Sequence, residues 1–201
     1  MQKYFKNYLD ATDIIDYHDE NIQALAKKLS LGSSDDEAIV KNCYEWVRDI
    51  IHHSGDYQDD ITTYKASDVL KYGTGWCYAK SHLLAALLRA NDIPTGFAYQ
   101  RLSCSEYKPD IYCLHGLNWI YIKKYEWYKV DVRGNKEGVN AQFTPPHEQL
   151  AFALGENEYD VDGNFHEPLD VVIEALKKYK SYEEMICHFP DVEADDNKDD
   201  L

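Results

Sequence analysis

The sequence predicts an α+β fold in which helices come first and an antiparallel sheet follows. Between residues 19 and 50, apolar residues recur at steps of three and four, which is typical of helices that bury one face. Residues 83–88 are apolar on nearly every side, as in a central, buried helix. Beyond Pro94 the apolar pattern takes a period of two, which indicates strands. Helices followed by strands, without regular alternation of the two, are typical of α+β domains.

Two amphipathic helices are predicted before the central one. The first spans about residues 19–30. The second follows Ser34, a preferred N-cap residue, and the acidic residues 35–37 complement the positive end of its dipole. Its buried face carries five residues at helical spacing, namely Ile39, Cys43, Trp46, Val47 and Ile50. Cys43 and Trp46 are therefore expected to belong to the core.

A polar segment and a glycine-flanked turn lead into the central helix. Residues 54–66 are polar and irregular, so we expect a loop there. Gly73 and Gly75 then break the chain just before Cys77. The helix that starts there is predicted to continue to about Asn91. Cys77 is thus placed at the first turn of a buried helix.

The second half of the chain is predicted to form strands and one more helix. The predicted segments are a strand at residues 96–102, a polar excursion at 103–113, hairpin strands at 115–122 and 126–132, a turn at 133–138, an extended segment at 143–146 and an amphipathic helix at 169–180. We expect the central cysteine-bearing helix to pack on this antiparallel sheet.

One domain is predicted to cover residues 1–190. The chain has 201 residues, of which 44% are hydrophobic, and these values suit a single domain with its own core. Residues 191–201 are rich in acidic side chains and are predicted to be a disordered tail.

The composition excludes several classes of partner. A formal net charge of −15 repels phosphate backbones, so nucleic acid is not expected to bind. No apolar run approaches the roughly 20 residues that span a bilayer, so we expect no membrane association. No HExxH or EF-hand-type sequence is present, so no metal and no other cofactor is expected.

The cysteines and the N-terminus favour a reduced, cytoplasmic location. The five cysteines are odd in number and form no CxxC pair. The N-terminal residues are not followed by the apolar region of a signal peptide. Cytosolic proteins keep their thiols reduced, which agrees with this pattern.

Cys77 has the sequence environment of a nucleophile. A thiol at a helix N-terminus meets the positive end of the helix dipole and unpaired backbone N–H groups, which stabilise the nucleophilic thiolate. The same N–H groups could bind a developing oxyanion. Free cysteine is also among the most buried residue types, so an ordinary core thiol explains the position equally well. Spacing alone leaves both interpretations open.

Among the eight histidines, His115 is the best proton acceptor for such a thiol, because it opens a strand of the predicted sheet. His82 lies five residues after Cys77 on the same helix and points to another side, so a structural or solvated role is expected. His52 and His53 are expected at the end of the second helix.

Asp131 is the candidate that would orient His115, since it is an acid within an otherwise strand-like run. A three-residue hairpin loop at residues 123–125 pairs Ile122 with Glu126. That register makes Asp131 a diagonal neighbour of His115 on one side of the sheet. It also gathers three apolar residues on the other side, namely Ile120, Val130 and Val132. An edge-strand aspartate that faces solvent is the alternative.

These segments together resemble the transglutaminase-like superfamily. The resemblance rests on Gly73-Thr74-Gly75-Trp76-Cys77-Tyr78-Ala79-Lys80, on Leu83-Leu84-Ala85-Ala86-Leu87-Leu88-Arg89, on Asn91-Asp92-Ile93-Pro94 and on Tyr44-Glu45-Trp46-Val47-Arg48-Asp49-Ile50. Asp92 stands where the family usually has glycine. The match covers about residues 36–134, and His115 and Asp131 follow Cys77 in the order of the family. The stretch from Val132 to Phe152 resembles small bacterial members that are described as candidate cysteine proteases.

The resemblance implies a papain-like fold and acyl-transfer chemistry. Cys77 would attack an amide or ester carbonyl of a peptide or protein, His115 would transfer the proton, and Asp131 would orient His115. The Cys77 backbone N–H would supply one oxyanion donor. Lys71 stands where papain-like enzymes often have a glutamine donor, so the candidates for a second donor or for the substrate groove are three aromatic residues, Trp46, Tyr64 and Trp76.

Several functions remain open at this stage. Water or an amine could resolve the acyl-enzyme, which separates a peptide hydrolase from an acyltransferase. An amidase that acts on a glycan-linked peptide is a subclass of the same chemistry. A non-catalytic module that binds peptides or glycans on the same fold is the alternative from another class. Oligomeric state and substrate identity have no signal in the sequence.

Overall fold

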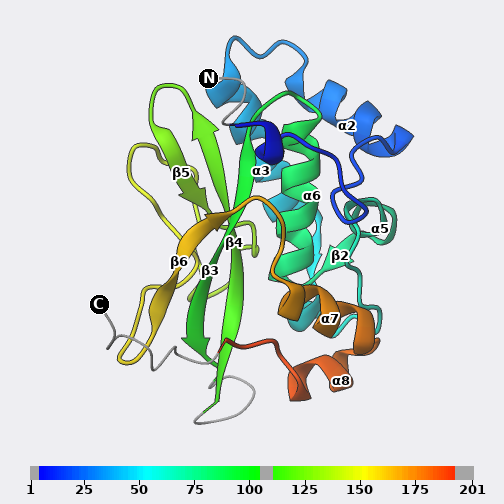
Figure 1. The fold of residues 1–201 in the computed structure, drawn as a ribbon, viewed down its shortest axis with the longest axis vertical. Coiled ribbons are helices and arrows are strands. Elements are labelled where there is room, and N and C mark those ends of the chain that lie inside the picture. The colour runs from blue at the N-terminus through cyan, green and yellow to red at the C-terminus, as the bar shows by residue number, and fades with distance from the viewer. Residues whose placement is uncertain (1–4, 105–110, 193–201) are drawn as a thin grey trace.

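The structure is a computed structural model that describes residues 5–104 and 111–192. Helices cover one face of a four-stranded sheet, and the helix that begins at Cys77 lies between the sheet and the outer helices (Figure 1). The N-terminal helical elements are η1 (Lys6–Tyr8), α2 (Glu20–Ser30), α3 (Asp36–Ile50), α4 (Ser54–Tyr57), α5 (Ala66–Tyr72) and α6 (Cys77–Arg89). The predicted α+β class is confirmed.

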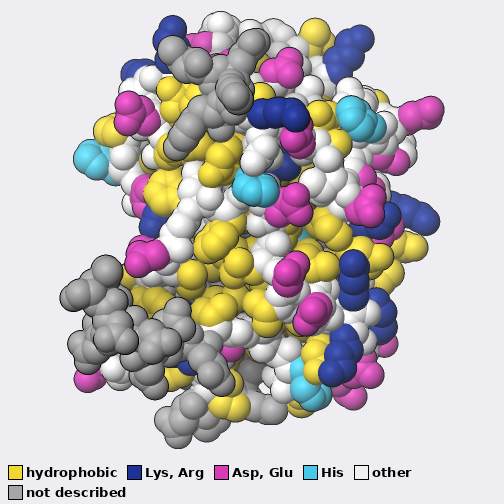
Figure 2. Space-filling view, viewed as in Figure 1, with side chains coloured by type: hydrophobic (Ala, Val, Ile, Leu, Met, Phe, Trp, Pro, Cys, Tyr) yellow, Lys and Arg dark blue, Asp and Glu magenta, His cyan; other side chains and the backbone are white. Residues whose placement is uncertain are grey.

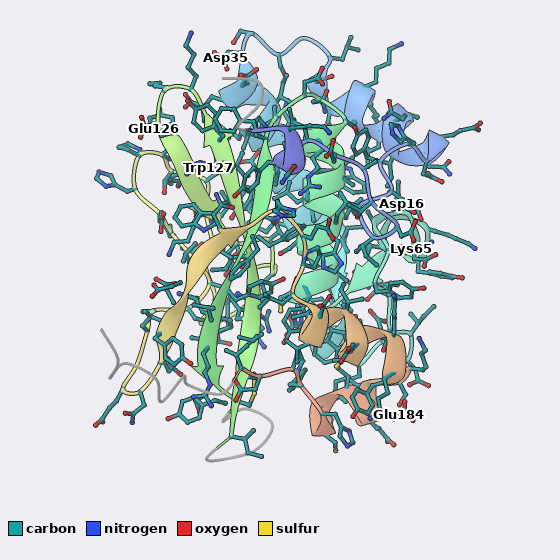
Figure 3. The ribbon with its side chains drawn as sticks, viewed as in Figure 1. Asp16, Asp35, Lys65, Glu126, Trp127 and Glu184 are labelled. Carbon is teal, nitrogen blue, oxygen red and sulfur yellow. A yellow bond between two sulfur atoms is a disulfide. The ribbon has the colours of Figure 1, made fainter. Side chains whose placement is uncertain are left out.

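Helices α2 and α3 form where the apolar periodicity predicts them, but the predicted cap of α3 is wrong. Asp35, not Ser34, is the N-cap of α3, and its carboxylate accepts a hydrogen bond from the backbone N–H of Ala38 at 2.9 Å. Figure 3 labels Asp35 at the start of this helix. An aspartate serves this position as well as a serine, and its charge also complements the helix dipole.

The segment between α3 and α6 is more ordered than expected. His52–His53 form strand β1 instead of a helix end, and β1 pairs in parallel with β2 (Thr74–Gly75). The predicted loop at residues 54–66 begins with helix α4 and is followed by the unpredicted helix α5. Neither helix exceeds two turns, so neither leaves a clear periodicity in the sequence.

Helix α6 is buried along its whole length. All 13 of its residues are buried, including the polar side chains of Lys80, His82 and Arg89. Lys80 donates to the carbonyl oxygens of Arg48 and Ile51, which lie at the C-terminal end of α3. Because buried polar groups need hydrogen-bond partners, this bond ties α6 to α3.

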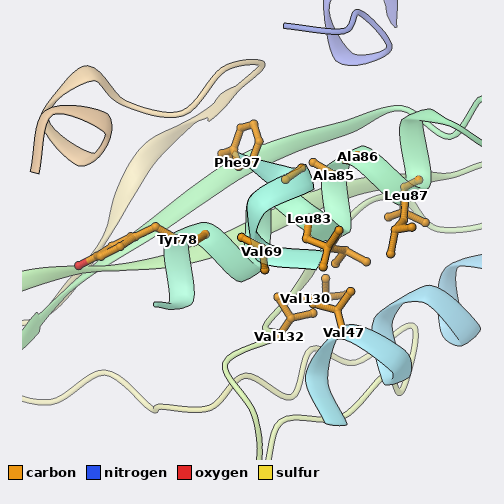
Figure 4. Close-up of a cluster of buried hydrophobic side chains, with 14 of the residues drawn as sticks. Val47, Val69, Tyr78, Leu83, Ala85, Ala86, Leu87, Phe97, Val130 and Val132 are labelled. Carbon is orange, nitrogen blue, oxygen red and sulfur yellow. The ribbon is translucent and has the colours of Figure 1, made fainter. Parts of the chain in front are cut away.

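The core lies between α6, α3 and the sheet. Leu83 and Leu87 of α6 pack toward Val47 of α3 and toward Val130 and Val132 (Figure 4). All five side chains are completely buried or almost so. This packing fixes α6 against the sheet and with it the position of the residue that begins the helix.

The main sheet is antiparallel, with the strand order β5-β4-β3-β6. Its strands are β3 (Thr95–Ser103), β4 (Tyr112–Ile122), β5 (Glu126–Val130) and β6 (Tyr159–Phe165). The predicted hairpin register is confirmed, since Ile122 pairs with Glu126 and Ile120 with Tyr128. Strand β6 was not predicted, because it is a largely exposed edge strand with a glycine in its interior.

Two helices end the described chain. The predicted helix at residues 169–180 is α7 (Asp170–Lys178), and α8 (Tyr182–Cys187) follows it without having been predicted. The carbonyl oxygen of Pro190 accepts a hydrogen bond from the N–H of Leu114 at 2.8 Å, so the chain returns to β4 after α8. Most of the predicted tail, residues 193–201, and most of the polar excursion lie outside the described residues. The division into a domain at 1–190 and a tail stays a prediction.

Candidate active site

A cavity of about 310 Å³ lies where the N-terminal end of α6 meets β4. Cys77 and His115 both line it. Aromatic and aliphatic side chains form much of the remaining wall, namely Trp76, Tyr78, Leu102, Leu114, Phe152 and Phe189. On the face shown in Figure 2, apolar side chains gather near the centre, between acidic and basic side chains. A mostly apolar cavity with a few polar groups is typical of a ligand site.

Cys77 is the first residue of α6, and its thiol lies against β4. Only 6% of the residue is exposed, and its Sγ accepts the backbone N–H of Gly116 at 3.4 Å. A larger residue would be crowded at that place in β4, because a Cβ on Gly116 would lie 3.0 Å from the Cα of Tyr78. The close approach of the strand to the first turn of α6 therefore sets the position of the thiol.

His115 lies on β4, one residue before Gly116, and is also 6% exposed. Its Nε2 is 2.7 Å from Oδ2 of Asp131, and the ring stands edge-on to Phe152 with 5.1 Å between centroids. Nε2 is thus engaged by the carboxylate, so Nδ1 is the ring nitrogen that remains available to the thiol.

Asp131 follows directly after β5 and is completely buried. Besides His115, its carboxylate accepts the backbone N–H groups of Arg133 and Ala151, both at 2.9 Å. These bonds fix the orientation of the carboxylate, which in turn fixes the imidazole ring. A solvent-facing aspartate, the alternative from the sequence, does not match this burial.

The electrostatics of His115 and Asp131 favour their charged forms. Burial alone would lower the pKa of His115, but the charge of Asp131 and the neighbouring Cys77 outweigh it and raise that pKa above its ordinary 6.5. Burial alone would raise the pKa of Asp131, yet His115 and the two backbone N–H groups hold it below its ordinary value. The pair therefore favours an imidazolium next to the thiol.

The three aromatic candidates for a second oxyanion donor or groove residue are placed differently. Trp76 lines the cavity as the residue before Cys77. Trp46 and Tyr64 are not among the described residues that line it, and both pack at the edge of the core. Tyr64 instead accepts a hydrogen bond at its carbonyl oxygen from the ring of His82, at 2.7 Å. His82 is buried and so is not solvated, while its structural role agrees with expectation.

The cavity also holds residues that sequence reasoning did not select. They are His53, Arg133, Phe152, Phe189 and the pair Cys104 and Cys113. His53 left no signal in the sequence, because two consecutive histidines show no alternation of polar and apolar residues and form a strand of only two residues. Phe189 gave no signal, because only the return of the chain after α8 brings it to Trp76.

Cys104 and Cys113 are joined in a disulfide, and Cys43, Cys77 and Cys187 are free. Disulfides persist in oxidising compartments and are rare in the cytosol. This bond counts against the cytoplasmic location expected from the sequence, which stays a prediction. Among the described residues, no group of three or more His, Cys, Asp or Glu side chains is arranged to hold a metal ion. Within the same residues, no helix has the length and apolarity to cross a bilayer.

Comparison with protein families gives one match. The model of the transglutaminase-like superfamily matches residues 23–132, which is more than half of the chain and includes all three candidate catalytic residues. No curated protein matches the chain.

Solved structures with a similar fold were also found. A protein titled a "putative cysteine protease" from Cytophaga hutchinsonii superposes with a TM-score of 0.54 at 20% identity, over 66% of this chain and 43% of the other. A structure titled a TGase gives a TM-score of 0.41 at 18% identity, over 73% of this chain and 40% of the other. The chain thus spans less than half the length of the first of these proteins. At this identity, the first likeness supports the fold alone.

Proposed function

Because this chain belongs to the transglutaminase-like superfamily, we propose that it is a cysteine-dependent acyl-transfer enzyme that acts on amide bonds of peptides or proteins. Cys77 is the nucleophile, His115 the general base and acid, and Asp131 the residue that orients His115. The observation that carries the proposal is the pairing of His115 with the buried Asp131 at 2.7 Å, in the cavity wall that also presents Cys77.

The chemistry follows from this arrangement. The thiolate of Cys77 attacks the carbonyl carbon, a C–S bond forms, and the carbonyl π electrons move to oxygen. The tetrahedral intermediate collapses as the C–N bond breaks, and the imidazolium of His115 protonates the leaving amine. His115 is then neutral and accepts a proton from water or from an incoming amine, which attacks the thioester and releases Cys77.

The first turn of α6 supplies one site for the oxyanion. The backbone N–H of Cys77 has no intrahelical acceptor at this position, because it belongs to the first residue of the helix. An N–H in that place can donate to the oxygen of a carbonyl that Cys77 attacks, and the helix dipole favours negative charge there.

The wall of the cavity favours an apolar acyl group. Trp76, Phe152 and Phe189 line it, and Glu158 is its acidic lining residue. An extended peptide with an apolar side chain next to the scissile carbonyl fits this lining. We propose hydrolysis as the main outcome, since water is always available to resolve the thioester.

Alkylation and acylation of Cys77 test the proposal. Iodoacetamide should label Cys77 faster than Cys43 and Cys187 at pH 6, well below the pKa of about 8.5 of an ordinary thiol, as read by peptide mass spectrometry. p-Nitrophenyl acetate should leave an acetyl group on Cys77, and hydroxylamine should release it. Labelling no faster than that of an ordinary thiol, together with no acylation, would favour the peptide- or glycan-binding module instead.

A further inference from the structure

His53 lines the same cavity as Cys77 and His115 but has no role in the triad. Strand β1 brings it there, because the parallel pairing with β2 sets His53 beside Gly75, two residues before Cys77. Its ring stands edge-on to Trp76, with 5.6 Å between centroids. The side chain therefore lies next to the turn that presents the nucleophile.

The imidazole of His53 is buried without a hydrogen bond. The residue is only 7% exposed, and its Nδ1 is enclosed with no hydrogen-bond partner among the residues that the structure describes. The nearest carboxylate oxygen, Oδ2 of Asp56, is 3.9 Å from Nδ1, which is too far for a hydrogen bond. No hydrogen bond at Nδ1 therefore fixes which ring nitrogen of His53 carries the proton.

Asp56 is held by other residues and does not hold the His53 proton. Its carboxylate accepts two bonds from Arg133, at 2.6 and 2.8 Å, and one from Lys136 at 2.8 Å. No hydrogen bond to Asp56 fixes the proton of His53 on Nδ1, so an oxygen that accepts from Nε2 selects the tautomer with the proton there. Since Nδ1 is turned toward Asp56 and enclosed, the opposite ring edge, which carries Nε2, is the edge that can meet the cavity.

The surroundings of His53 favour its neutral form. Burial is the largest cause that lowers its pKa well below the ordinary 6.5, and the positive charge of Arg133 adds to it, while Asp56 opposes both. A neutral imidazole with its proton on Nε2 is a hydrogen-bond donor toward the cavity.

We propose that His53 is the second oxyanion donor of the site. This inference rests on the proposed function. The Nε2–H of His53 hydrogen-bonds the carbonyl oxygen as Cys77 attacks, opposite the Cys77 backbone N–H. No proton is transferred in this step, so His53 stabilises charge without acting as an acid or a base. The position that Trp46 and Tyr64 do not reach is then filled by a histidine.

Two reactions of Cys77 separate this role from that of the triad. Hydrolysis of p-nitrophenyl acetate passes through an oxyanion, whereas alkylation by iodoacetamide is a displacement at a saturated carbon and forms none. His53→Phe keeps the ring against Trp76 and removes the donor. We expect it to lower kcat by roughly 10²–10³, as loss of one oxyanion donor does elsewhere. The alkylation rate of Cys77 should stay within about twofold of the wild-type rate.

The control variants keep the inference testable. His53→Gln restores an N–H donor and should recover at least about tenfold of the lost kcat. Circular dichroism would reveal whether the Phe variant folds. If it does not, the kcat values of His53→Leu and His53→Gln are compared instead. His52→Phe is the matched control, because His52 is exposed on the opposite side of the same strand and should leave both rates unchanged.

The outcomes distinguish this inference from the proposed function. A His53→Phe variant with wild-type esterase activity would overturn the oxyanion role alone. A parallel loss of esterase activity and alkylation, or no recovery in His53→Gln, would assign His53 a structural role and also overturn it. A wild-type protein whose Cys77 is never acylated would overturn the proposed function, and this inference with it.

Discussion

At the scale of single residues, the site depends on which nitrogen of His115 carries a proton. The carboxylate of Asp131 accepts from Nε2, which leaves Nδ1 for the thiol. The candidate triad of Cys77, His115 and Asp131 was predicted from the sequence, because the hairpin register and the family resemblance both indicated it. His53 was not, since its place beside Gly75 depends on a two-residue parallel pairing that has no periodicity.

Replacement of Asp131 tests this tautomer directly. Asp131→Asn can donate to Nε2 of His115 and so stabilises the wrong tautomer, in which Nδ1 carries the proton. We expect kcat for p-nitrophenyl acetate to fall by roughly 10²–10⁴, with a folded protein by circular dichroism. Asp49→Asn is the control, because this exposed carboxylate is not among the described residues that line the cavity of Cys77. Full activity in Asp131→Asn would remove Asp131 from the triad.

The same pair predicts how stability depends on pH. The pKa of His115 is raised on folding, so its charge contributes stability in full below about pH 6.5, and this is lost as pH rises through the raised pKa. The pKa of Asp131 is lowered, so its contribution is complete above about pH 3.9 and is lost as pH falls through the lowered pKa. The pair therefore stabilises the fold most between these two values.

Urea unfolding of the wild type and of Asp131→Asn from pH 3 to pH 10 measures this contribution. The difference in unfolding free energy should be largest between about pH 4 and pH 6.5 and should shrink toward both ends of the range. A difference that does not change with pH would mean that His115 and Asp131 do not form an ion pair in the folded protein.

At the scale of secondary-structure elements, the site is a junction between α6 and β4. Seven elements were predictable, because burial of one face or of all faces leaves a periodic pattern in the sequence, namely α2, α3, α6, β3, β4, β5 and α7. The elements β1, α5 and α8 were not predictable, since tertiary contacts, and not a periodic pattern in the sequence, determine their structure. The hydrogen bond from the N–H of Leu114 in β4 to the carbonyl oxygen of Pro190 is likewise a product of the folded chain.

Gly116 tests the junction. A Cβ at Gly116 would crowd the backbone of Tyr78 at 3.0 Å, so Gly116→Ala should push the first turn of α6 away from β4 and destabilise the protein by about 1–3 kcal/mol. Alkylation of Cys77 should slow at the same time, because the thiol loses its fixed place beside His115. Thermal unfolding and peptide mass spectrometry measure the two effects.

Gly96→Ala is the matched control for that prediction. Its Cβ would meet Oδ1 of Asn164 at 2.1 Å and the carbonyl oxygen of Phe165 at 2.9 Å, on the far part of the sheet. It should lower stability as well, yet leave the alkylation rate of Cys77 unchanged. If Gly116→Ala also leaves that rate unchanged, then the contact between β4 and α6 does not position the thiol.

At the scale of the whole molecule, segments far apart in the sequence complete one cavity. Trp76 and Cys77 come from the start of α6, His53 from β1, and Phe189 from the end of the described chain. Composition and periodicity predicted the fold that carries these residues, but not the segments that close the cavity around Cys77. Loops and chain ends have no periodic burial, so their packing is visible only in three dimensions.

The disulfide between Cys104 and Cys113 differs from the expectation that all five cysteines are reduced. The bond closes a loop with a sequence separation of 9 between β3 and β4 and forms part of the cavity wall. We predict that the denatured, unreduced protein exposes three thiols, those of Cys43, Cys77 and Cys187, and five after reduction.

The energetic consequence of this bond can be measured in the same protein. A loop of this length constrains the unfolded chain by about 2–3 kcal/mol, so Cys104→Ser with Cys113→Ser should lower the free energy of unfolding by that amount in urea. Cys187→Ser removes an exposed, unpaired thiol and serves as the control for thiol loss alone. Five reactive thiols before reduction, or equal stability of the Cys104 and Cys113 variant, would contradict the bond. The reduced, cytoplasmic setting inferred from the odd cysteine count would then regain its support.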